Sequence, residues 1–157
     1  MATPAESRNS GFLKLTMTEI REASEQDVVH LHKLVHELGY SISESDLTIQ
    51  VHKILQAEDH YCFVAVSDQT IIGLIHAFKA VRLTSPDFME IGSLAVNENF
   101  RGKGVGKMLV RHLESCLEPQ QNLRVRCNVK REEAQKFYEK LDFSLKKSQN
   151  VYVKQLN

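Results

Sequence analysis

The sequence predicts an α/β fold in which a mixed central sheet carries helices on both faces. The chain has 157 residues, of which 42% are hydrophobic and 25% charged, and this composition is typical of one globular domain with a substantial core. Segments with helical hydrophobic spacing alternate with segments rich in strand formers, in the order β-αα-βββ-α-β-α-β. Strands and helices that alternate in the second half favour strand–helix–strand units.

A flexible arm over residues 1–17 is predicted to precede a single domain over residues 18–157. The arm is polar, and its apolar stretch is too short and interrupted to act as a secretion signal. A short strand is expected over residues 19–23. Two amphipathic helices follow, opened by Ser24 and Ser43, each with an aspartate three residues later as in a capping box.

The predicted sheet begins in the middle of the chain. Strand formers over residues 61–66 and 71–78 enclose a polar turn, which indicates a hairpin. A loop at residues 85–87 then leads to a strand over residues 88–96. The remaining elements are a helix over 104–118, a strand over 123–129, a helix over 132–141, and closing strands near Phe143 and Val151.

The most informative stretch lies between the strand over 88–96 and the helix that follows it. It contains three glycines and three cations, namely Gly102, Gly104, Gly106, Arg101, Lys103 and Lys107. Glycines let backbone N–H groups approach a ligand closely, and the following helix directs its positive end to the same place. The stretch therefore predicts a binding site for a pyrophosphate or a similar anion.

Two other phosphate-binding motifs do not fit this stretch. A Walker A loop needs four residues between its first glycine and the Gly-Lys pair, whereas only three separate Gly102 from Gly106. Met108 also stands where that loop needs a serine or threonine for Mg²⁺. The glycine spacing also differs from that of the dinucleotide-binding motif GxGxxG. In a dinucleotide-binding fold this motif follows the first strand of the sheet, whereas here several predicted strands precede the glycines. The stretch fits Arg-x-x-Gly-x-Gly instead.

The chain resembles the GNAT superfamily of N-acetyltransferases in three stretches. These are Arg101-Gly102-Lys103-Gly104-Val105-Gly106, Leu94-Ala95-Val96 and the segment Ala134–Phe143. The resemblance covers roughly residues 19–155 and implies a GNAT-like acyl-CoA N-acyltransferase fold. It also implies acetyl-CoA as the cosubstrate. It assigns contact with CoA to Leu94, Ala95, Val96, Arg101, Gly102, Lys103, Gly104, Val105, Gly106 and Lys107.

Two residues are candidates for catalysis. Tyr138 has the spacing of a core tyrosine on the last helix; the resemblance implies instead that it protonates the CoA thiolate. Strand alternation places Glu90 on one face with Gly92, Leu94 and Val96. The resemblance makes Glu90 a candidate general base, with a water molecule as the alternative.

Three further positions bear on the resemblance. Asn128 ends the strand where the family often has an asparagine that touches the cofactor, but its spacing to Ala134 is longer than usual. Arg131 takes the expected spacing, so both residues are candidates. Asp142 stands where a glycine commonly ends the helix, and aspartate tolerates the left-handed conformation at a small cost in stability.

Charge and cysteine content limit the partners. Twenty basic residues balance twenty acidic ones, which gives no indication of a nucleic-acid or membrane partner. The three cysteines are widely spaced and form no CxxC pair, so reduced thiols in the cytoplasm are expected. His32 and His36 lack a third ligand, and no metal site is predicted. An exposed sheet edge and the segment after Ser148 predict a homodimer.

Three functions remain open at this point. The first is an acetyltransferase that acts on a primary amine of a small molecule. The second is acetylation of a protein lysine or N-terminus, and the third is a sensor that binds acyl-CoA without turnover. A sensor has no need of Tyr138, so the presence of both Tyr138 and the glycine-rich turn favours catalysis.

Overall fold

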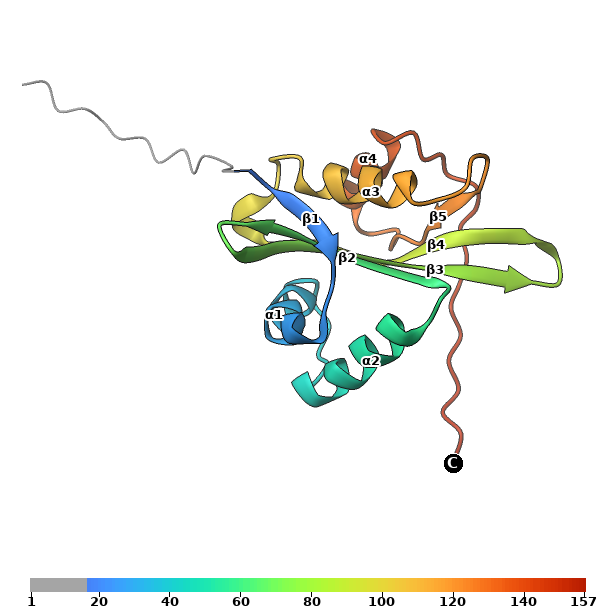
Figure 1. Ribbon diagram of the computed structural model, residues 1–157. Coiled ribbons are helices and arrows are strands. Elements are labelled where there is room, and N and C mark those ends of the chain that lie inside the picture. Colours follow the sequence, from blue (N-terminus) through green and yellow to red (C-terminus); the bar gives the residue numbers. More distant parts are fainter. Residues whose placement is uncertain (1–16) are drawn as a thin grey trace, which may run out of the picture.

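A five-stranded sheet with helices on both faces organises residues 17–157, the part of the chain that this computed structural model describes (Figure 1). The predicted fold class is confirmed. All of the predicted arm except Met17 lies outside the described residues. The elements are β1 (Glu19–Glu22), α1 (Val28–Glu37), α2 (Glu44–Gln56), β2 (His60–Ser67), β3 (Thr70–Arg82), β4 (Ser85–Val96), α3 (Val105–Ser115), β5 (Leu123–Val125) and α4 (Glu132–Glu139), with short 3-10 turns at Glu25–Asp27 and Glu98–Phe100.

Both predicted capping residues are at helix starts. The Ser43 hydroxyl accepts a hydrogen bond of 3.0 Å from the Asp46 N–H at the start of α2. The Ser24 N–H donates to the Asp27 carboxylate at 2.8 Å. The Arg21 guanidinium also donates twice to that carboxylate, at 2.8 and 2.9 Å, and these bonds lower the pKa of Asp27. The cap therefore ties β1 to the start of the helical segment.

The strands lie in the order β1-β2-β3-β4-β5. The first four are antiparallel to their neighbours, whereas β5 runs parallel to β4. β5 pairs with β4 only over Met89–Ile91, because it ends at Val125 rather than at Val129 as predicted. Along residues 92–96, the edge of β4 that faces away from β3 has no strand partner among the described residues.

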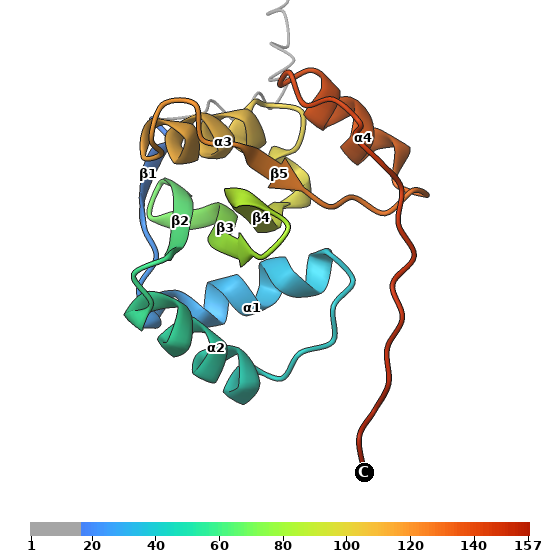
Figure 2. The same cartoon turned by 90° about the vertical axis from the view of Figure 1, so that its right-hand side faces the viewer.

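The two layers of helices enclose separate halves of the core. α1 and α2 cover one face, and α3 and α4 lie on the other (Figure 2). Leu109 and Leu113 of α3 are fully buried against the sheet, and truncation of such a leucine to alanine typically costs about 2–5 kcal/mol. The observed layers therefore agree with the prediction of a central sheet that carries helices on both faces.

The hairpin of β3 and β4 is longer than predicted. β3 extends to Arg82 and β4 begins at Ser85, so the connection is Leu83–Thr84. The predicted loop at residues 85–87 is instead part of β4. Strand pairing with β3, which a local turn signal cannot reveal, extends the strand through Pro86 at the sheet's end.

A β-bulge at Gly92 changes which side chains share a face of β4. His76 pairs with Ser93 and Ala77 pairs with Ile91, which leaves Gly92 as the extra residue. Beyond the bulge the alternation is shifted by one. The predicted common face of Glu90 with Leu94 and Val96 is therefore wrong. Leu94 and Val96 pack on the α3 side, and Glu90 lies on the opposite face, as does Ala95.

The closing strands predicted near Phe143 and Val151 do not form. The Phe143 N–H donates to the Tyr138 carbonyl at 3.1 Å, and its ring packs against the α3 side of the core. From residue 144 onward the chain is exposed and extended, without a strand partner among residues 17–157. A strand requires a neighbour to pair with, and strand propensity alone does not show whether one is in reach. No helix in the described part of the chain is long and apolar enough to cross a membrane.

Candidate active site

The turn between β4 and α3 carries two glycines in the left-handed region. Gly102 has a φ of +73° and Gly104 a φ of +85°, a conformation that costs other L-residues about 1–2 kcal/mol. A Cβ added at either glycine would have no protein atom within 4 Å. α3 begins directly afterwards, and the N–H groups of a first helical turn have no acceptor within the helix. The turn therefore presents open backbone donors and a positive helix end, as an anion site requires.

Basic side chains remain close to this turn. The Arg101 Nε donates to the Val96 carbonyl at the end of β4, at 3.1 Å. The Lys103 ammonium lies 5.2 Å from the centre of the Phe100 ring, within the range of a cation–π contact. Both interactions hold positive charge beside the glycines.

Gly106 has a different role from the other two glycines. It lies inside α3, and a Cβ at this position would be 3.1 Å from the Phe137 ring. Such a contact is too close for an unshifted neighbour. The absence of a side chain at Gly106 therefore serves the packing of α3 against α4. The sequence analysis predicted that all three glycines allow a ligand to approach, and it did not predict this packing role of Gly106.

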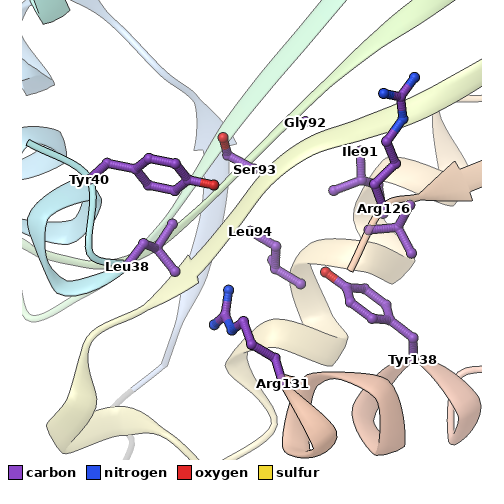
Figure 3. Close-up of a pocket in the computed structure, with 10 residues that line it drawn as sticks. Leu38, Tyr40, Ile91, Gly92, Ser93, Leu94, Arg126, Arg131 and Tyr138 are labelled. Carbon is purple, nitrogen blue, oxygen red and sulfur yellow. The ribbon is translucent and has the colours of Figure 1, made fainter. Parts of the chain in front are cut away.

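A pocket of about 70 Å³ opens where β4 and β5 separate (Figure 3). Ile91, Gly92, Ser93 and Leu94 of β4 form one wall, and Leu38 and Tyr40 close it from the end of α1. Val125, Arg126, Arg131 and Tyr138 line the other side. The pocket thus joins the free edge of β4 to the last helix.

Tyr138 directs its hydroxyl into this pocket, toward Leu94 (Figure 3). Its ring is held edge-on between Phe137 and Phe143, with centroid distances of 5.1 and 5.4 Å. Burial, with a smaller effect of the nearby Cys127, raises the pKa of Tyr138 to about 12, although Arg131 opposes the shift. At neutral pH the phenol is therefore a protonated, neutral hydrogen-bond donor that faces the pocket.

Glu90 is buried but does not line the pocket. The Arg126 Nε lies 2.9 Å from one carboxylate oxygen, and the Arg82 guanidinium lies 3.8 Å from the other. The carboxylate therefore faces two guanidinium groups and not the pocket.

The model of the acetyltransferase (GNAT) family matches residues 17–143, which include both the turn and Tyr138. The chain belongs to the GNAT acetyltransferase family. Membership makes it an acetyltransferase, as the resemblance implied. A comparison with curated proteins gives no match.

Solved structures of other acetyltransferases share this GNAT fold. The aminoglycoside 6′-N-acetyltransferase AAC(6′)-IG from Acinetobacter haemolyticus is 19% identical, with a TM-score of 0.78 over 88% of this chain and 99% of that one. AAC(6′)-Iy in complex with CoA is 20% identical, with a TM-score of 0.79 over 89% and 96%. Glucosamine-6-phosphate N-acetyltransferase from Arabidopsis thaliana is 20% identical, with a TM-score of 0.72 over 87% and 98%.

The remaining candidate contacts of this GNAT domain lie in different environments. Leu94 lines the pocket, whereas Ala95 is buried on the α1 side and Val96 packs on the α3 side. Asn128 lies outside the pocket, where its side-chain oxygen accepts the Lys130 N–H at 2.9 Å. Arg131 lines the pocket, with its guanidinium directed toward Leu94 (Figure 3).

Several pocket residues had no signal in the sequence. Tyr40 and Ser93 meet at the pocket, where the Tyr40 hydroxyl points toward Ser93 (Figure 3). Arg126 also escapes sequence reasoning, because the predicted strand runs through it. Gly39, with a φ of +91°, follows the end of α1 and comes immediately before Tyr40.

Four of the seven histidines of this acetyltransferase form two pairs. The imidazoles of His32 and His36 are 3.2 Å apart and lie 2.9 and 3.2 Å from the Ile42 carbonyl, so they fasten the loop between α1 and α2. His60 and His76 form the second pair across β2 and β3. Among residues 17–157, no group of three or more His, Cys, Asp or Glu side chains could hold a metal ion.

Proposed function

We propose that this chain transfers the acetyl group of acetyl-CoA directly to a primary amine of a small molecule. The observation that carries the proposal is the position of the pocket. It lies beside the unpaired edge of β4, with the Tyr138 hydroxyl directed into it. β4 continues through the short 3-10 turn Glu98–Phe100 into the glycine turn at the start of α3. One continuous path therefore offers an anion site, a free strand edge and a proton donor.

Acetyl-CoA fits this path in its chemistry. The pyrophosphate would bind the N–H groups of the turn at Gly102 and Gly104, with Arg101, Lys103 and Lys107 close in sequence. The pantetheine amides would pair with the free backbone edge near Leu94–Val96, in the manner of an added strand. Val105 and Gly106 would contribute first-turn N–H groups.

The chemistry requires few protein groups. The neutral amine attacks the thioester carbonyl, the carbon–sulfur bond breaks, and the thiolate leaves. Tyr138 donates its hydroxyl hydrogen to the departing sulfur, a role supported by its protonated state and its position. The amine proton leaves through water, which also returns a proton to the Tyr138 oxygen. Water has this role because the Glu90 carboxylate faces two guanidinium groups and lies outside the pocket. Glu90 then acts by positioning Arg126.

A small-molecule acceptor is supported by the structural neighbours. Their names assign them aminoglycosides and glucosamine-6-phosphate as substrates. The Tyr138 hydroxyl in the pocket argues against a sensor that only binds acyl-CoA. Reduced cysteines support a cytoplasmic location: Cys62, Cys116 and Cys127 are unbridged thiols in the described chain.

Acetyl-CoA binding and turnover test the proposal separately. Acetyl-CoA is expected to raise the melting temperature, whereas ATP and NAD are not, because a ligand that binds only the folded state stabilises it. Thiol release from acetyl-CoA is then measured against a library of primary amines. A melting temperature that millimolar acetyl-CoA leaves unchanged would refute the proposal.

A further inference from the structure

Three arginines gather at one side of the pocket, around Glu90 and Phe88. Arg126 and Arg82 both approach the Glu90 carboxylate, at 2.9 and 3.8 Å. The Arg124 guanidinium lies over the Phe88 ring at 3.8 Å, and the Arg82 guanidinium lies 5.0 Å from the same ring. A single carboxylate therefore balances only part of the positive charge of this cluster.

The excess charge is presented outward. The Glu90 side chain is 9% exposed, whereas the side chain of Arg126 is 65% exposed and lines the pocket. Arg131 lines the pocket as well, and no aspartate or glutamate does among the described residues. A molecule that enters the pocket thus meets the Arg131 guanidinium beside Leu94. At the outer side of the pocket it meets Arg126, whose guanidinium is directed away from Leu94 and whose Nε is paired with Glu90 (Figure 3).

These cations are separate in the sequence from those of the CoA turn. The turn has Arg101, Lys103 and Lys107 together with its own backbone donors. Arg126 follows β5, on the side of the pocket where β4 carries its bulge at Gly92 (Figure 3). The pyrophosphate therefore does not require Arg126, which leaves this side chain for the acceptor.

On the basis of the proposed function, we propose that the acceptor is an amine that also carries a carboxylate or a phosphate. Arg126 binds this anionic group, because a guanidinium matches both groups with paired hydrogen bonds. Nearby positive charge also favours the neutral form of the acceptor amine, which is the form that attacks the thioester. A polycationic amine is repelled by the same side chains.

Matched amines test the acceptor class. β-Alanine is compared with propylamine, and O-phosphoethanolamine with ethanolamine, within a library of amino acids, amino sugar phosphates and their uncharged counterparts; neamine represents polycations. We expect kcat/KM to be on the order of tenfold or more higher for the anionic member of each reactive pair. The two series distinguish a carboxylate from a phosphate. Neutral or polycationic amines that react as well as anionic ones would overturn the inference.

The role of Arg126 is tested by Arg126→Gln, with Arg111→Gln on the exposed side of α3 as the matched control. Arg126→Gln is expected to raise KM for the anionic acceptor about tenfold or more, and to change KM for the neutral counterpart much less. Arg126→Lys should restore part of the loss. An equal loss for both acceptors would mean that the substitution acts through Glu90, and the inference would fail.

Calorimetric binding of acetyl-CoA distinguishes failure of this inference from failure of the proposed function. A protein that does not bind acetyl-CoA contradicts the proposed function itself. A protein that binds acetyl-CoA but acetylates no anionic amine contradicts the acceptor class alone.

Discussion

Nδ1 of His60 lies 2.9 Å from Nε2 of His76, and the two rings stack with their centroids 5.2 Å apart. The pair sits beside the β-bulge, where a Cβ at Gly92 would be 3.0 Å from Nδ1 of His76. Burial, with a smaller effect of the neighbouring His60, lowers the pKa of His76 to about 4. The fold therefore holds His76 in its neutral form.

This arrangement predicts a loss of stability in mild acid. The pKa of His76 in the folded protein is below its ordinary value of 6.5. The stability that depends on neutral His76 is therefore fully present above pH 6.5 and is lost as the pH falls toward 4. A shift of this size corresponds to about 3 kcal/mol in the free energy of unfolding. Urea unfolding should show that the free energy of unfolding falls less between pH 7 and pH 5 in His76→Phe than in the wild type. Exposed His30→Gln is the control, and an unchanged loss in His76→Phe would contradict the prediction.

Tyr138→Phe should reduce turnover while leaving folding and CoA binding intact. The ring packing is kept and only the hydroxyl is removed. We expect kcat to fall about 10²-fold, the lower end for loss of a general acid, because a thiolate is a fair leaving group. KM for acetyl-CoA should change little. Tyr61→Phe, a half-buried tyrosine outside the pocket, is the control; near-normal kcat in Tyr138→Phe would return Tyr138 to a packing role.

Gly104→Val should weaken binding of CoA. A β-branched residue at a φ of +85° is strained, and its side chain would project into the open side of the turn. Gly39→Val is the matched control, because Gly39 has a φ of +91° with equally open surroundings at the end of α1. Calorimetry should show reduced CoA affinity only for Gly104→Val, although both variants lose stability. Equal CoA affinities in the two folded variants would count against the binding turn.

Asp142→Gly should stabilise the protein. Asp142 ends α4 with a φ of +67°, as the sequence predicted for this position, and glycine adopts this conformation without the steric cost. We expect a gain of about 0.5–1 kcal/mol in the free energy of unfolding. The ion pair lost with Arg111 is long, at 3.9 Å, and exposed, so it contributes little. A less stable Asp142→Gly in chemical unfolding would show that the side chain matters more than the backbone.

The protein is predicted to form a dimer through its C-terminal segment. Val151, Tyr152 and Val153 are 80–90% exposed, and the outer edge of β5 has no strand partner among residues 17–157. The segment of a second copy could satisfy that edge. Sedimentation should therefore show twice the 17.9 kDa mass of one chain. The double substitution Val151→Asp with Val153→Asp should convert the dimer to the monomer, whereas the control Val81→Asp in the exposed hairpin should not. A wild-type protein that sediments as a monomer at high concentration would contradict the prediction.

The sequence identified most elements because their signals are local. The serine caps at Ser24 and Ser43 and the left-handed Asp142 each depend on a few neighbouring residues. The glycine turn was visible for the same reason. The C-terminal end of β5, the start of β4 and the absence of closing strands depend on pairing between distant segments, and these were predicted incorrectly.

The sequence by itself therefore determined the class of the fold and the glycine turn between β4 and α3. Their signals lie in periodicity and in short motifs, which backbone stereochemistry enforces locally. Spacing alone gave Tyr138 a packing role, and only the resemblance to the GNAT family made it the candidate proton donor. Only the tertiary structure decided which side chains line the pocket. The bulge at Gly92 placed Glu90 on the opposite face from Leu94, and the separation of β5 from β4 brought Arg126 and Tyr40 to one pocket. Strand register and side-chain proximity arise from contacts between segments far apart in the chain, so no local pattern contains them.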